Sequence, residues 1–182
     1  DSTYIDYGVC NEKYTYLILC VSPIDGSVVY SNSVEYDPQY NKPEDSLSLQ
    51  LVTVKESSSI SIYWSSNNIF NAQKYYVDRY DPFTGWRHQY RETDDTVMID
   101  SVVNPNRINY SYRIWYRDFC GRKSPYSNVG GSILLQADIS HEGYNYEWNS
   151  YERWSKGVEK YIVERTYDLS KPFKIDTILG AD

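Results

Sequence analysis

The sequence predicts an all-β protein made of tandem copies of one small sandwich. Tyrosine is unusually abundant, at 21 of 182 residues, whereas methionine occurs once and no long stretch repeats apolar residues at helical spacing. Aromatic and β-branched side chains suit the half-buried face of a pleated sheet. In addition, two sequence signatures each occur twice at long spacing. Internal repeats of this kind indicate an array of small domains.

The first signature relates residues 3–32 to residues 97–128. Each copy starts with an Ile-Asp pair, continues with a Tyr-x-Tyr strand and ends in Tyr-Ser-Asn after a turn. One constant offset matches Tyr14 with Tyr110, Tyr16 with Tyr112, Ile18 with Ile114, and Ser31-Asn32 with Ser127-Asn128. The second signature relates residues 60–79 to 144–165, and it matches Trp64 with Trp148 and Arg79 with Arg165.

These repeats divide the chain into three units and a linker. Residues 46–132 are predicted to form one complete domain. Residues 1–36 are the C-terminal half of a preceding domain, and residues 133–182 are the N-terminal half of a further one. Residues 37–45 contain two prolines and no periodicity, so we expect a stiffened linker. The chain is therefore expected to be a window on a longer protein.

Turn signals separate seven short strands in the complete unit, which favours a β-sandwich. The first is predicted to be an edge strand with a bulge, because its alternation shifts between Leu51 and Val52. Trp64 is predicted to point inward from the second strand. The expected strands are 47–54, 60–64, 75–80, 86–92, 97–100, 110–116 and one that starts near residue 126.

The arrangement of these residues resembles the fibronectin type III family of immunoglobulin-like sandwiches. The resemblance rests on a Trp in the second strand, a Tyr-x-hydrophobic strand after it, and a Tyr-x-Tyr-x-Ile strand followed by Gly-x-x-Ser-Pro-Tyr-Ser-Asn. It implies tandem fibronectin type III-like domains along most of the chain. It also implies a tyrosine corner at Tyr110 and Tyr14, so that Tyr110 bonds to backbone in the 102–108 loop and Trp64 is buried.

A narrower resemblance concerns the run from Tyr110 to Asn128 and the run from Tyr144 to Arg165. Both are similar to tandem modules of large secreted Bacteroidota proteins, the gliding-motility-associated cargo of the type 9 secretion system. The resemblance implies an extracellular or cell-surface location. Family members often carry a Cys before the Trp strand. Residues 138–146 contain none, which leaves Cys120 without that partner.

The net charge of −7 bears on the class of partner. An acidic chain lacks the basic surface that nucleic acid requires, so we expect no nucleic-acid partner. No apolar run is long enough for a membrane-spanning helix, so we expect no direct membrane insertion. Three cysteines allow at most one intramolecular disulfide. Cys10 and Cys20 form one possible pair, although strand geometry places them far apart unless the loop folds back.

The sequence favours a protein that is not an enzyme and takes no metal or cofactor. His88 and His141 are the two histidines, and neither stands near a nucleophile motif or an orienting carboxylate. The scattered His and Cys residues give no zinc-ligand spacing. Both histidines are predicted to lie at the surface.

Two sets of residues remain as candidate sites. The first is a surplus of aromatics that either grips a glycan or protein partner, or covers the sheet edge and the domain junctions. The second is a set of hydroxyl residues after Asp, which resembles the O-glycosylation motif of Bacteroidota envelope proteins, although turns ending in Asp before strands produce the same triplets. The aromatics are Trp86, Tyr90, Trp115, Tyr151 and Trp154, and the hydroxyl residues in the candidate set are Ser46, Thr96, Ser101 and Thr177.

Two functions are compatible with the sequence. The first is a non-catalytic spacer in a secreted or cell-surface protein, with neighbouring domains of the same polypeptide as its main partners. The second is an adhesion module that binds cell-surface proteins, secretion machinery or polysaccharide through exposed Trp and Tyr.

The two half-domains raise a separate question about their apolar side chains. Standing alone, they would expose the faces that carry Tyr14, Tyr16 and Ile18 in one half and Trp148 and Tyr161 in the other. Either the polypeptide continues at both ends, which we prefer, or the front half of one molecule pairs with the back half of another.

Overall fold

The computed structural model describes residues 2–6, 9–10, 12–37, 47–55, 58–66, 72–118, 120–141, 143–151, 157–165 and 173–179. These residues form strands and no helix, so the all-β prediction is confirmed. The strands are β1 (Tyr14–Tyr16), β2 (Leu19–Val21), β3 (Val28–Tyr30), β4 (Val34–Tyr36), β5 (Leu47–Lys55), β6 (Ser59–Ser66), β7 (Ala72–Asp81), β8 (Gly85–Thr93), β9 (Val97–Asp100), β10 (Ser111–Asp118), β11 (Gly130–Gly131), β12 (Leu135–Ser140), β13 (Gly143–Trp148), β14 (Lys160–Arg165) and β15 (Phe173–Leu179). Across these ranges there is no helix with the length and apolar character needed to cross a bilayer.

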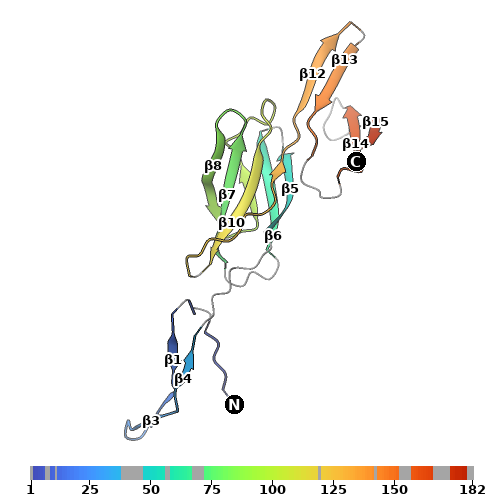
Figure 1. The fold of residues 1–182 in the computed structure, drawn as a ribbon. Coiled ribbons are helices and arrows are strands. Elements are labelled where there is room, and N and C mark those ends of the chain that lie inside the picture. Colours follow the sequence, from blue (N-terminus) through green and yellow to red (C-terminus); the bar gives the residue numbers. More distant parts are fainter. Residues whose placement is uncertain are drawn as a thin grey trace.

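Two antiparallel sheets form the middle of the molecule and share one core (Figure 1). One sheet has the order β5-β6-β9 and the other the order β11-β10-β7-β8. Alternate residues of each strand point inward, as the period of two requires. Trp64 is 4% exposed, which confirms its predicted burial. The buried core residues are Leu47, Leu49, Val52, Ile60, Ile62, Trp64, Tyr75, Val77, Tyr110, Tyr112, Ile114 and Tyr116.

The predicted bulge in the first strand exists, but it lies slightly earlier than expected. Leu49 pairs with Trp64 and Leu51 pairs with Tyr63, so Gln50 is the extra residue. The added residue reverses the alternation. As a result Leu49 and Val52 both point into the core.

The last strand of the middle sandwich uses serine side chains for much of its pairing with β10. The amides of Ile114 and Tyr116 donate to the hydroxyls of Ser127 and Ser124, at 2.8 and 2.9 Å. Regular ladder pairing is limited to Gly130–Gly131. Gly130 is required there, because a Cβ atom would lie 2.6 Å from Cδ2 of Leu49.

The tyrosine corner is present in the middle sandwich. The amide of Asn104 donates to the hydroxyl of Tyr110 at 3.2 Å, as predicted. At the equivalent position of the N-terminal unit, the amide of Cys10 donates to the hydroxyl of Tyr14, also at 3.2 Å.

The segments on either side repeat parts of the middle sandwich in atomic detail. Residues 14–36 form a hairpin in which β1 pairs with β4 and β2 pairs with β3. In it the amide of Ile18 donates to the hydroxyl of Ser31 at 2.9 Å, which matches the bond between Ile114 and Ser127. In the C-terminal segment β12 pairs with β13, and β14 pairs with β15.

A disulfide joins Cys10 to Cys120, a pairing that the sequence analysis did not consider. Cys10 does not pair with Cys20, which is free and exposed. Cys120 has a partner after all, and the bridge joins the N-terminal segment to the turn that follows β10.

The first prediction compares one substitution at two equivalent positions. Ile114 is fully buried, whereas Ile18 is 68% exposed. Replacing Ile114 with Ala should lower the free energy of unfolding by about 2–5 kcal/mol, because it leaves a cavity. Ile18→Ala should change it by less than about 0.5 kcal/mol in dilute protein. Urea denaturation followed by tryptophan fluorescence checks both values, and equal effects would contradict the assignment of one closed and one open unit.

Candidate functional site

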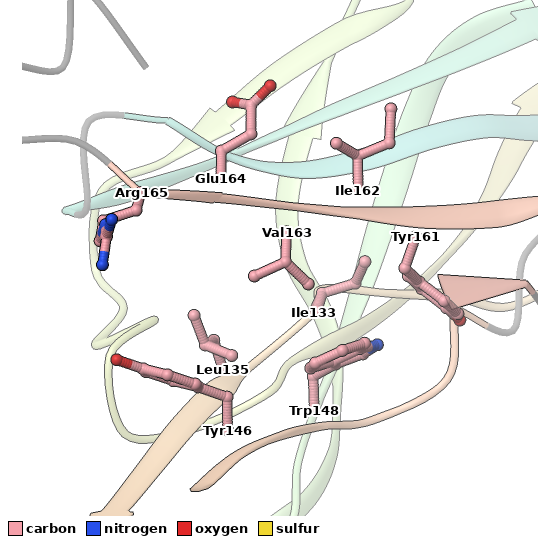
Figure 2. A pocket seen from close by; sticks show the side chains of 9 residues that line it. All are labelled: Ile133, Leu135, Tyr146, Trp148, Tyr161, Ile162, Val163, Glu164 and Arg165. Carbon is pink, nitrogen blue, oxygen red and sulfur yellow. The ribbon is translucent and has the colours of Figure 1, made fainter. Parts of the chain in front are cut away.

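The C-terminal segment contains an open apolar pocket with a volume of about 500 Å³. Its wall comes from β12, β13 and β14, together with the residue that leads into β12 (Figure 2). Tyr146 and Trp148 lie below Val163 and Tyr161 in that view. The lining residues are Ile133, Leu135, Tyr146, Trp148, Tyr161, Ile162, Val163, Glu164 and Arg165.

The residues that line this pocket correspond to the early-strand core residues of the middle sandwich. The rings of Trp148 and Tyr161 meet edge to face at 5.5 Å, just as Trp64 and Tyr75 do at 5.8 Å. Leu135 pairs with Trp148 as Leu49 pairs with Trp64. In the middle sandwich, β10 lies beside β7 in the same sheet and adds Tyr112, Ile114 and Tyr116 to the core that holds this set. No late strand covers the pocket within the described residues, so Leu135 is 59% exposed.

The N-terminal hairpin carries the counterparts of the late-strand core residues of the middle sandwich. Ile18 and Leu19 are exposed, and Tyr14 and Tyr16 are half-buried. The hydroxyl of Tyr16 donates to Asp6 at 3.1 Å, as the hydroxyl of Tyr112 donates to Asp100 at 3.0 Å. The hairpin thus has the side chains and bonds of a late strand, but no early-strand sheet beneath it among the described residues.

A buried carboxylate ties the two sheets of the middle sandwich together. Asp100 of β9 accepts hydrogen bonds from Tyr112 of β10 and from Tyr90 of β8, the latter at 2.7 Å. Arg79 of β7 donates to Asp100 at 2.9 Å. Burial and the negative charge of Asp100 raise the pKa of Tyr112 far above its ordinary value. The phenol therefore stays protonated and continues to donate.

A second feature covers the outer face of the four-stranded sheet, where cationic and aromatic side chains alternate. The guanidinium of Arg113 lies 4.2 Å from the ring centre of Trp86 and 3.7 Å from that of Tyr126. The ammonium of Lys123 lies 4.2 Å from Tyr126 and 4.3 Å from Trp115. Such contacts stabilise each ring and cation by about 0.5–2 kcal/mol.

Asp78 lies fully buried beneath this outer face. It accepts bonds from His88 at 2.8 Å, from the amide of Gln89 at 2.9 Å and from Trp115 at 3.1 Å, and Arg113 approaches at 3.2 Å. The β7–β8 register shifts at this point, and Gln89 adopts a φ of 50° that directs its amide to the carboxylate. Burial raises the pKa of Asp78, but these bonds outweigh it and hold the pKa below its ordinary value.

The structure favours burial over ligand contact for most of the candidate aromatics. Tyr90 and Trp115 are buried in the two polar clusters just described. Tyr151 is buried at the junction between the middle sandwich and the C-terminal segment. Trp86 is half-buried against Arg113, and Trp154 lies outside the described residues.

The hydroxyl candidates are found in different settings. Thr96 and Ser101 are exposed, and Thr177 is half-buried. Ser46 lies outside the described residues. Asp100, which precedes Ser101, is engaged with Arg79, so this triplet has a structural role in addition to any modification.

The predicted surface histidines also differ. His141 lies in an exposed turn, whereas the partly exposed ring of His88 reaches the buried carboxylate of Asp78. No group of three or more His, Cys, Asp or Glu side chains suited to a metal ion occurs in the part of the chain that the structure describes.

The sequence analysis missed Asp78 and the pairing of Cys10 with Cys120. The sequence gives no signal for the first, because alternation with inward-facing Val77 and Arg79 places Asp78 on the outer face, where a carboxylate is ordinarily exposed. The pairing of two distant cysteines across a linker leaves no local signal.

Comparison with known proteins gives no relative. No protein-family model matches the chain, and no curated protein sequence matches it.

The second prediction concerns Asp78. Asp78→Asn leaves Arg113 without its charge partner, so the free energy of unfolding at pH 7 should fall by about 3–5 kcal/mol. The lowered pKa of Asp78 makes the native carboxylate a stabilising group above the unfolded pKa, about 3.9, and this contribution is lost as pH falls through the folded pKa. The gap between the two proteins should therefore narrow as pH falls from 5 towards 2.

Urea titrations at several pH values measure this gap. Asp95→Asn, at an exposed bend, is the matched control and should leave stability nearly unchanged. A gap that stays constant across this pH range would contradict the role assigned to the Asp78 carboxylate.

Proposed function

We propose that this chain is a rigid structural spacer made of tandem fibronectin type III-like units in a secreted or cell-surface protein. The observation that carries the proposal is that specific bonds fix both junctions between the units. Repeated sandwiches with fixed junctions suit a protein that must hold another domain at a set distance.

The first junction is covalent. The disulfide between Cys10 and Cys120 joins the N-terminal segment to the far end of β10, next to the turn at Gly121. The sulfur of Cys120 also lies 3.7 Å from the carbonyl oxygen of Val9. A covalent tie at this point limits rotation of the hairpin about the 37–45 linker.

The second junction is a chain of hydrogen bonds. The amide of Val52 in β5 donates to the buried hydroxyl of Tyr151 at 3.0 Å, and the amide of Tyr151 donates to Tyr161 in β14 at 3.1 Å. Asn149 accepts from the amide of Leu134 at 2.7 Å and donates to the carbonyl of Ser132. The bond between Val52 and Tyr151 is buried, so breaking it is costly because it leaves an unsatisfied polar group.

An extracellular setting agrees with these features. Disulfides persist in oxidising compartments and are rare in the cytosol. The tyrosine corner at Tyr110 and the serine-bonded last strand are compatible with the resemblance to gliding-motility-associated modules. We extend the proposal to a secreted protein of that kind, with neighbouring domains of the same polypeptide as partners.

Adhesion through exposed aromatics is the second candidate, and the geometry supports it less. Tyr90, Trp115 and Tyr151 are buried. The guanidinium of Arg113 lies against the rings of both Trp86 and Tyr126 and so covers one face of each.

The third prediction tests rigidity. Spin labels on Cys20 and on an Ile139→Cys substitution, both exposed, should give a narrow distance distribution by pulsed electron resonance in samples diluted with unlabelled protein. The paired change Cys10→Ser with Cys120→Ser should broaden it, because the hairpin loses its covalent tie. Tyr151→Phe should also broaden it, because Val52 loses its acceptor.

The matched control is Tyr63→Phe, which removes a partly exposed hydroxyl that takes part in none of the junction bonds named above. A broad distribution in the unmodified chain, or no change in either junction variant, would contradict the spacer proposal.

A further inference from the structure

We propose that the β8 edge of the middle sandwich contains a binding site for a sulfate or phosphate group, in which Arg87 and Arg91 bind the anion beside Tyr90. The proposal goes beyond the spacer function, since a rigid spacer needs no ligand. It rests on three arginines that meet at one aromatic ring and on the strained bulge that brings them together.

Three guanidinium groups surround the ring of Tyr90. Their central carbons lie 4.0 Å from the ring centre for Arg79, 4.9 Å for Arg91 and 5.2 Å for Arg87. The last two carbons therefore lie within about 10 Å of each other. Contacts between a cation and the face of a ring are attractive, so Tyr90 holds these side chains close to one another.

The positive charges of this cluster are only partly balanced. Among the described residues, Arg79 alone of the three has a carboxylate partner, which is Asp100 at 2.9 Å. Arg87 and Arg91 are exposed to solvent. Like charges held this close repel each other, and an anion bound between them removes the repulsion.

The register of β8 places the three arginines on one face of the sheet. Arg91 pairs with Val77 of the core, and Arg87 pairs with Arg79. Cross-strand partners lie on the same face, which is the inward one here. Tyr90 also points inward, because its hydroxyl donates to the carboxylate of the facing sheet at 2.7 Å.

A bulge is what allows Tyr90 and Arg91 to share this face. In a regular strand, neighbouring residues point to opposite faces. Here residues 88–90 of β8 all stand opposite Asp78 of β7, and Gln89 has a φ of 50°. A positive φ is strained for any residue other than glycine, and such strain is concentrated at ligand-binding and catalytic positions. The bonds to Asp78 maintain the bulge, and the bulge maintains the arginine cluster.

The chemistry of the cluster selects a tetrahedral oxyanion. A guanidinium is a planar fork that donates two parallel hydrogen bonds to one oxyanion. Arg87 and Arg91 provide two such forks. A carboxylate has only two oxygens to share between them, whereas a sulfate or phosphate ester has three terminal oxygens. The ring of Tyr90 is covered by the guanidinium groups, so the site recognises the charged group rather than a sugar ring.

The position of the cluster favours the approach of an anion. β8 forms one edge of the four-stranded sheet (Figure 1). Residues 46–132 contain ten Lys and Arg against eight Asp and Glu, whereas the rest of the chain contains eight against seventeen. The middle sandwich is therefore the basic part of an acidic chain, and its field directs anions towards this part.

The test is a titration of the 182-residue chain, labelled with nitrogen-15, with sodium sulfate and with sodium phosphate. Sodium chloride keeps the ionic strength constant, so that changes in screening do not contribute. Two-dimensional magnetic resonance spectra should show saturable shifts at the backbone amides of Arg87, Tyr90 and Arg91.

Substitutions of the two exposed arginines test the contacts. The chain with both Arg87→Gln and Arg91→Gln should bind sulfate about tenfold more weakly or not at all, because both forks are lost. The chain with both Arg87→Lys and Arg91→Lys keeps the charge and should still bind about fivefold more weakly, because an ammonium has no fork. Circular dichroism checks that each variant folds.

The matched control is Lys55→Gln, which removes an exposed positive charge from β5, at the edge of the three-stranded sheet opposite β9. This variant should bind sulfate as the wild type does. A loss equal to that of the arginine variants would show a response to net charge alone and would contradict a specific site.

Dextran sulfate and unmodified dextran identify the source of the group. Dextran sulfate should shift the same amides, and unmodified dextran should shift none. Tighter binding per sulfate group by dextran sulfate assigns the site to an ester on a polymer, and equal or weaker binding assigns it to the free anion. Shifts that do not saturate, or that spread over the other exposed lysines and arginines, would overturn the proposal. Binding that is unchanged in the Arg87→Gln, Arg91→Gln chain would overturn it as well, and would leave these arginines as charges that keep the β8 edge from pairing.

Discussion

The contact between a Trp of one sheet and a Tyr of the facing sheet is the one on which the whole structure depends. In the middle sandwich Trp64 of β6 meets Tyr75 of β7 edge to face at 5.8 Å, and β10, beside β7, adds Tyr112 and Ile114 to the same buried core. A sheet that is apolar on one face must cover that face with another layer. The same pair recurs as Trp148 and Tyr161, which line the open pocket of the C-terminal segment.

Buried carboxylates give this packing its orientation. Asp100 gathers donors from β7, β8 and β10, so it joins the two sheets through Arg79, Tyr90 and Tyr112. Asp78 of β7 joins the neighbouring strands β8 and β10 through His88 and Trp115, and these bonds offset the cost of burying its carboxylate. An apolar core tolerates small shifts between its layers, whereas these bonds require particular distances. The recurrence of the Tyr–Asp bond at Tyr16 and Asp6 indicates that the hairpin is built for the same alignment.

The alternation of apolar and polar residues predicted most of the fold. Alternation and turn residues predicted the strands and the inward Trp64, because these depend on neighbours in the chain, whereas the bond of Tyr110 was implied by the fibronectin type III resemblance. The Cys10–Cys120 disulfide depends on how two units meet, and no local pattern encodes that.

The candidate site was harder to predict than the fold. The sequence analysis treated Trp115 as an aromatic that the sandwich could not bury. It did not consider that cationic side chains cover aromatic rings on the outer face of a sheet. The open pocket could be expected from the repeat, because Trp148 and Tyr161 match Trp64 and Tyr75.

A double-mutant cycle on the Trp64–Tyr75 pair tests this account most directly. Urea titrations of Trp64→Leu, Tyr75→Leu and the chain with both changes give the coupling free energy between the two rings. Because the rings meet edge to face at 5.8 Å across the two sheets, the coupling should be about 0.5–1.5 kcal/mol. A coupling within error of zero would contradict the account.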